Sequence, residues 1–107
     1  MLAVILEFDV IVGMESQFRQ AWIETTQLIY QNFGSLGSRL HQADNGVFIA
    51  YAQWPSLKVY EDDHQWPETL MSSREKMTSC LKIGKPKVLH KLTLDTDLLK
   101  ADCCTAK

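Results

Sequence analysis

The chain has 107 residues and a mass of 12.2 kDa, which is enough for one hydrophobic core but not for two. Hydrophobic residues make up 46% and charged residues 22%, a globular balance that excludes long disorder except at the ends. The 11 Lys and Arg residues against 13 Asp and Glu residues give a net charge of −2, so nucleic-acid binding is not expected.

Targeting and redox signals are weak in this sequence. No segment approaches the roughly 18 apolar residues that a membrane span requires. The apolar start, residues 1–6, lacks a basic region and a cleavage site, so it does not resemble a signal peptide. The cysteines Cys80, Cys103 and Cys104 are odd in number and indicate neither a disulfide framework nor a metal pair. We therefore expect a cytoplasmic protein without a metal site and without membrane association.

The first third of the chain changes its hydrophobic period once. In residues 2–12 every even position is apolar and the odd positions are mixed, which predicts a β-strand that ends before Gly13. Residues 14–33 carry apolar side chains at helical spacing and predict an amphipathic helix. Glu15 suits its first turn, and Gly34 suits its end.

The middle of the chain predicts a hairpin. Residues 36–43 form a weaker strand, and residues 44–46, Asp-Asn-Gly, are typical of a tight turn. Residues 47–54 are apolar on both faces, so this strand is expected in the centre of the sheet. Ser56 can then cap a short helix that follows it.

The last third predicts a helix and an edge strand. Pro67 suits the first position of a helix over about 67–82, which would bury Leu70, Met77, Cys80 and Leu81 and end at Gly84. Residues 86–95 alternate and begin with proline, as edge strands do; this alternation places Val88 and His90 on the same face. Residues 96–107 form a polar tail outside the domain of residues 1–95.

The order of predicted elements, β-α-β-β-α-β, indicates an α+β, ferredoxin-like fold with a four-stranded antiparallel sheet. Right-handed crossovers would place both main helices on one face of that sheet. The first and third strands are apolar on both faces, so the other face would be a large exposed apolar patch. We therefore expect a homodimer in which two sheets pack face to face, as in a dimeric α+β barrel.

Three segments carry a family resemblance. They are residues 13–22, a turn and amphipathic helix; residues 33–41, the second strand; and residues 47–56, a strand that ends in Trp54 and Pro55. With these segments the chain resembles the antibiotic biosynthesis monooxygenase-like family over about residues 2–95. The resemblance implies the dimeric barrel and a cofactor-independent oxygenase acting on a quinol or polycyclic aromatic molecule. The alternative is a non-catalytic dimeric module that binds an apolar small molecule or a partner protein.

The haem-degrading branch of that family is not matched. Its strand Asn is replaced here by Leu6, and residues 70–82 contain no His. An oxygenase without haem needs an apolar aromatic pocket, a base for a phenol, and a donor for the developing oxyanion. The aromatic residues that could form its walls are Trp22, Phe33, Tyr51, Trp54 and Trp66.

Several side chains could handle protons, and each has a structural alternative. His64 lies in an acidic run, and it is either a solvated loop residue or a pocket acid or base. His41 could instead lie at the surface or in a dimer contact, and His90 in the core. Glu7 and Asp9 stand two apart on one strand and could act as acid or base or join a polar network, with Arg39 as a partner. The tryptophans could equally pack in the core.

Overall fold

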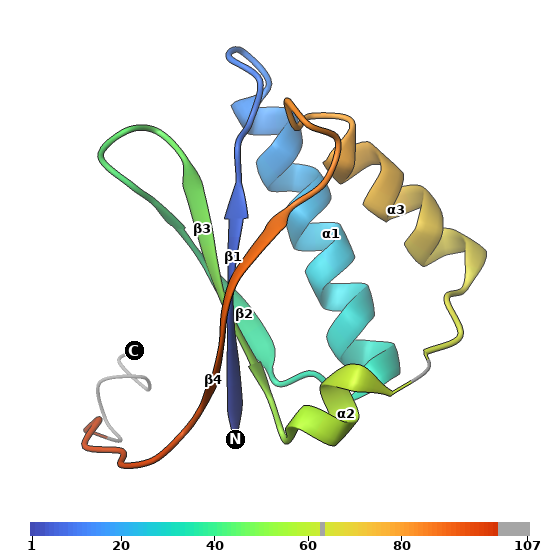
Figure 1. Cartoon of the computed structure of the whole chain (residues 1–107). Helices are drawn as coiled ribbons and strands as arrows, with labels where there is room; N and C mark the ends of the chain where they lie inside the picture. The colour runs from blue at the N-terminus through green and yellow to red at the C-terminus, as the bar shows by residue number, and fades with distance from the viewer. Residues whose placement is uncertain (63, 101–107) are drawn as a thin grey trace.

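The computed structural model describes residues 1–62 and 64–100. Along the chain the elements are β1 (Leu2–Phe8), α1 (Glu15–Phe33), β2 (Gly37–Gln42), β3 (Phe48–Trp54), α2 (Leu57–Glu61), α3 (Glu68–Thr78) and β4 (Lys87–Thr93). The strands form one antiparallel sheet in the order β2-β3-β1-β4. The helices lie on one face of this sheet (Figure 1). The expected ferredoxin-like architecture is confirmed, with β3 and β1 in the centre.

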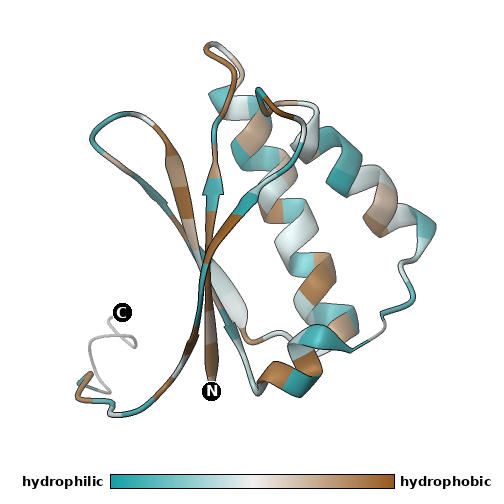
Figure 2. Cartoon of the chain, in the orientation of Figure 1, coloured by the Kyte–Doolittle hydropathy of each residue, from teal (hydrophilic) through white to brown (hydrophobic). Residues whose placement is uncertain are grey.

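The core lies between the sheet and α1 because one set of alternating side chains faces the helices. On β1 the even-numbered residues from Leu2 to Phe8 join two clusters of buried side chains, and on β3 those from Phe48 to Trp54 do the same. Phe18 of α1 is fully buried, and its ring lies 5.1 Å from the rings of both Phe8 and Phe48. Apolar residues line the central strands and the inner side of α1 in Figure 2.

Two residues singled out in the sequence, Gly34 and Ser56, explain where α1 ends and where α2 begins. Gly34 follows α1 with φ of 80°, a left-handed conformation that a glycine adopts without strain. Ser56 precedes α2, and its Oγ accepts a hydrogen bond from the backbone N–H of Val59 at 3.2 Å. In the hairpin, the Asn45 side chain accepts from the N–H of Val47.

The structure corrects two predicted boundaries, and both corrections have one cause. β1 ends at Phe8 instead of residue 12, and α3 ends at Thr78 instead of residue 82. Beyond both ends the chain pairs with itself: Val10 bridges Leu81, and the N–H of Ile11 donates to the carbonyl of Cys80 at 2.8 Å. The apolar pattern continued past each element because Val10, Cys80 and Leu81 are buried, although they lie outside the regular strand and helix.

The face alternation predicted for β4 is wrong after its first residues. The pairing of β4 with β1 shifts between Ile5 and Leu6, where β4 contributes one extra residue. Val88 lies opposite Leu6 and faces the helices, whereas His90 lies opposite Ile5 on the other face. His90 is exposed and is not a core residue. A bulge of one residue reverses the faces, and nothing in the local sequence marks it.

The sheet face that points away from the helices has an apolar centre and a polar edge. Its central positions are Ala3, Ile5, Ile49 and Tyr51, and Leu92 of β4 lies beside Ala3 with half of its surface exposed. Glu7, Arg39, His41, Gln53, Lys87 and His90 occupy the same face. We call the five apolar and aromatic residues of the first group the outer patch.

Beyond β4 the described residues run to position 100 without regular structure, and Leu98 and Leu99 are exposed. Cys103 and Cys104 lie outside the described residues. Of the described helices, none combines the length and the apolar character that crossing a membrane would require.

Candidate functional site

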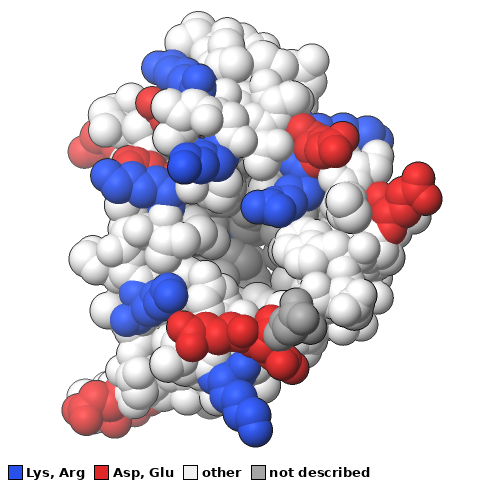
Figure 3. Space-filling view, turned by 45° about the vertical axis from the view of Figure 1, so that its right-hand side comes forward, with Lys and Arg blue, Asp and Glu red and all other residues white. Residues whose placement is uncertain are grey.

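The main cavity, of about 310 Å³, lies between the sheet and the helices. Its lining comes from every element of the chain: Val4, Leu6 and Phe8; Trp22, Thr25, Thr26, Ile29 and Phe33; Ser35, Ser38, Ala52 and Trp54; Tyr60, His64 and Trp66; and Arg74, Met77, Pro86 and Val88. This size matches the lower end of small-molecule sites. The space-filling view shows the surface hollowed between the two layers (Figure 3).

An aromatic cluster forms one wall of the cavity. The imidazole of His64 stacks on Phe33 with 4.3 Å between ring centroids and an interplanar angle of 21°, and it lies 5.9 Å from the ring of Trp54. Trp66 meets Phe33 edge-on at 5.4 Å, and Tyr60 meets Trp54 in the same way at 5.4 Å. The cluster therefore joins the end of α1, the end of β3, α2 and the segment before α3.

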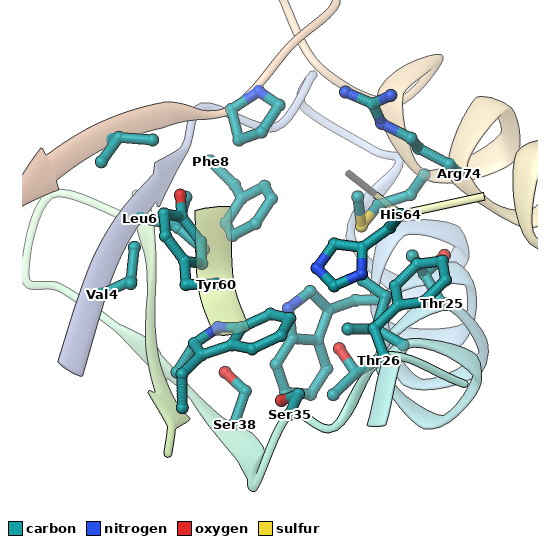
Figure 4. Close-up of a pocket in the computed structure, with 18 of the residues that line it drawn as sticks. Val4, Leu6, Phe8, Thr25, Thr26, Ser35, Ser38, Tyr60, His64 and Arg74 are labelled. Carbon is teal, nitrogen blue, oxygen red and sulfur yellow. The ribbon is translucent and has the colours of Figure 1, made fainter. Parts of the chain in front are cut away.

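Ring stacking orients His64 but leaves its Nε2 without a partner. This atom is buried and has no hydrogen bond within the described part of the chain. Leaving a buried polar atom unpaired costs about 1–3 kcal/mol, so such atoms often mark a place where a ligand binds. Figure 4 shows the imidazole entering the cavity opposite Val4, Leu6 and Phe8 of β1.

Polar groups occur at a few places in an otherwise apolar lining. Arg74 of α3 reaches the cavity above His64 in Figure 4, and its guanidinium lies over the Trp66 ring, 5.1 Å from the centroid. Thr25 is buried at the α1–α3 contact, where its hydroxyl and that of Ser73 are 3.1 Å apart. Ser73 in turn donates to Glu24 at 3.2 Å, which satisfies this buried pair.

The structure brings together five of the residues that the sequence suggested. Trp22, Phe33, Trp54, Trp66 and His64 all line the cavity, although they come from three separate parts of the chain: α1, β3 and the segment before α3. Trp22 and Trp54 also pack in the core clusters, so each of these two side chains borders both the core and the cavity.

The other five suggested residues do not line this cavity. Tyr51, Glu7 and His41 lie on the sheet face away from the helices, as does His90. Asp9 follows β1 and forms an exposed ion pair with Lys82 at 3.4 Å. The period-two pattern of a strand says which residues share a face, but not which face the helices cover.

A second, more polar cavity of about 290 Å³ adjoins the first at the β2 edge of the sheet. Thr26 and Ser38 line both cavities, and Tyr51 lines only the second. The Tyr51 hydroxyl accepts a hydrogen bond from the Gln53 side chain at 3.3 Å. Tyr51 therefore borders the neighbouring cavity and not the aromatic one for which it was suggested.

Sequence reasoning missed Tyr60, Arg74 and Met77 as cavity residues. Met77 was expected in the core, where it is buried, and it also borders the cavity. Tyr60 lies on a helix of only five residues, too short for a periodic pattern. Arg74 follows Ser73, which is buried in α3. Because serine is polar, the sequence did not mark this side of α3 as the side that faces the core. Among the described residues, no three His, Cys, Asp or Glu side chains converge on a possible metal site.

Comparison with known proteins finds likeness in structure but not in sequence. No family model matches the chain, and no curated protein matches it. A "putative antibiotic biosynthesis monooxygenase" from Bordetella bronchiseptica has a TM-score of 0.73 at 18% identity, covering 89% of this chain and 97% of its own. A protein of the same name from Caulobacter crescentus has a TM-score of 0.70 at 15% identity, covering 89% and 90%.

A third solved structure holds a ligand. It is a monooxygenase of Streptomyces coelicolor in complex with nanaomycin D, with a TM-score of 0.68 at 21% identity, covering 94% of this chain and 92% of its own. At such identities the likeness concerns the fold. The resemblance to antibiotic biosynthesis monooxygenase-like proteins that the sequence indicated is thus confirmed at the level of the fold, and the chain has the ferredoxin-like fold of these proteins.

Proposed function

We propose that the main cavity binds an aromatic small molecule with a phenolic hydroxyl, a quinol or a polycyclic anthrone, and promotes its oxygenation by O₂. The buried, unpartnered Nε2 of His64 carries this proposal, because a phenolic O–H would supply the hydrogen bond that the fold leaves unmade. The aromatic rings around it offer the stacking faces that a planar substrate needs. The fold shared with proteins named monooxygenases supports the same class of reaction.

The chemistry requires no group beyond the substrate, O₂ and a base. Nε2 of His64 accepts the phenolic proton, and the resulting anion transfers one electron to O₂. The two radicals combine in a C–O bond, which gives a peroxide. Loss of one water from this peroxide leaves a carbonyl, so an anthrone CH₂ and one O₂ become a C=O and one H₂O. The apolar walls exclude bulk water from the anion while it reacts.

Oxygen uptake by metal-free protein over a panel of hydroquinones and anthrones tests this function, with mass spectrometry of the products. Saturable uptake that yields a product with one added oxygen atom is the expected result. The His64→Gln variant should lose most of this turnover, and the matched variant His41→Gln, at an exposed site outside the cavity, should retain it. Ligand binding without any oxygen uptake would instead indicate a binding module.

We further propose that the outer patch is covered by a second copy of the chain. The patch has apolar side chains on the two central strands and on β4. Charged residues surround it on the same face, with Glu7 on β1, Arg39 on β2 and Lys87 on β4, which is the arrangement of an interface core and its rim. An apolar sheet face is rarely left to water in a monomer. Light scattering at micromolar concentration should give twice 12.2 kDa, and a mass of 12.2 kDa would contradict the dimer.

A further inference from the structure

The main cavity has one permanently charged residue in its described lining, and that residue is a cation. Arg74 reaches it from α3, whereas the remaining described lining is apolar, aromatic, hydroxyl-bearing or, at His64, imidazole. Arginine keeps its charge at every pH relevant to a protein. In the space-filling view, Lys or Arg side chains border the upper rim of the hollow with acidic side chains close above them, and further acidic and basic side chains lie below it (Figure 3).

Arg74 is not neutralised within the described part of the chain. The ion pairs found there join Lys82 to Asp9 and Lys91 to Glu61, and neither involves Arg74. The nearby Glu24 carboxylate accepts a hydrogen bond from Ser73 instead. Arg74 therefore brings a positive charge to the cavity mouth without forming either of these ion pairs.

The contact of Arg74 with Trp66 positions this charge without using its donors. The guanidinium lies over the face of the indole ring, 5.1 Å from the centroid. A guanidinium held in this way keeps its N–H groups at its edge, where they can form two parallel hydrogen bonds to a carboxylate. Trp66 is 37% exposed, so the pair sits at the border between the cavity and solvent.

We infer that this cavity selects aromatic substrates that carry a carboxylate, with Arg74 as the residue that determines this specificity. The inference rests on the proposed function, since it assigns the two ends of one substrate: the phenolic hydroxyl to His64 and the acidic group to Arg74 at the mouth. Arg74 lies above His64 in the cavity, so a planar ring system could reach both groups while it stacks on the aromatic wall (Figure 4).

Calorimetric titration with 2-naphthoate and its neutral analogue 2-naphthamide tests this selectivity apart from catalysis. The native chain should bind naphthoate about tenfold more tightly than naphthamide, a difference that corresponds to about 1.4 kcal/mol. Arg74→Gln should reduce the ratio to about one, and it should do so mainly by weakening the binding of naphthoate. Arg74→Lys, which keeps the charge but loses the paired donors, should retain part of the preference. Lys76→Gln, an exposed cation on the same helix, is the matched control and should retain all of it.

The possible results distinguish a failure of the carboxylate selectivity from a failure of the proposed aromatic pocket. Equal binding of naphthoate and naphthamide by the native chain would overturn the carboxylate selectivity and leave the aromatic pocket standing. A preference that survives Arg74→Gln would also overturn it, because another cation would then be responsible. Binding of neither compound would contradict the aromatic pocket itself. Rising salt should weaken naphthoate binding and leave naphthamide binding unaffected, since the contact lies at the solvent border.

Discussion

Replacing His64 by phenylalanine should make the chain more stable while it removes its proposed activity. The phenyl ring can keep the stack on Phe33 and the contact with Trp54, and it has no buried nitrogen to leave unpaired. A buried nitrogen without a hydrogen bond costs a folded chain about 1–3 kcal/mol. A phenyl ring is slightly larger than an imidazole, and the adjoining cavity of about 310 Å³ can accommodate the difference.

After allowance for imperfect fit of the new ring, we expect the free energy of unfolding to rise by about 1 kcal/mol. For a chain of this size such a change raises the melting temperature by roughly 4–8 °C. Urea unfolding followed by tryptophan fluorescence measures it, with both proteins at one concentration because a dimer couples stability to concentration. His64→Gln, which loses the ring stack and keeps a polar group, should be less stable than the native chain.

A stability of His64→Phe more than about 1 kcal/mol below that of the native chain would refute this reasoning. It would mean that Nε2 is satisfied in solution, and that the imidazole contributes to the fold by more than its stacking. Stabilisation together with loss of turnover is the pattern of a residue kept for function at the expense of stability.

Three further predictions concern the fold and are checked by urea unfolding. Phe18→Ala should cost about 3–5 kcal/mol, because a fully buried ring is lost from the Phe cluster, and a cost below about 2 kcal/mol would contradict that packing. Ser73→Ala should cost about 1–3 kcal/mol by leaving the Thr25 hydroxyl unpaired, and adding Thr25→Val should recover most of it; additive losses would disprove the coupling. Lys82→Ala should change stability by less than about 1 kcal/mol, since its ion pair with Asp9 is exposed, and a larger loss would show that the pair is better shielded.

The architecture could be predicted because hydrophobic periodicity and glycine positions are local properties. The helix over α1 was predicted to within a residue, since its apolar stripe and Gly34 mark both its face and its end. The errors occurred where pairing between distant segments decides the structure. Val10 and Leu81 extend the apolar pattern because they bridge each other. The bulge in β4 moves His90 to the sheet face away from the helices, and no residue near it in the sequence indicates this change.

The candidate site was partly predictable for the same reason. Trp22 and Phe33 belong to the stripe of α1, and Trp54 ends a central strand, so their inward orientation follows from the pattern. Which of the three histidines lies in the cavity depends on the path of the segment between α2 and α3. This segment has no periodic hydrophobic pattern from which its path could be predicted. Arg74 was overlooked because a charged residue on a surface helix is ordinarily solvated, whereas here its guanidinium lies over the Trp66 ring beside the cavity.

The proposed ligand cavity and the proposed dimer interface lie on opposite faces of one sheet, so experiments can test them separately. The described lining of the main cavity lies on the helix-covered face, whereas the outer patch lies on the other. Charged residues in place of Ile5 and Ile49 should therefore yield a monomer, because two buried like charges would face their copies. If the monomer remains folded, it should still bind 2-naphthoate, since its pocket is formed within one chain. Loss of binding in a folded monomer would show that the partner supplies part of the site.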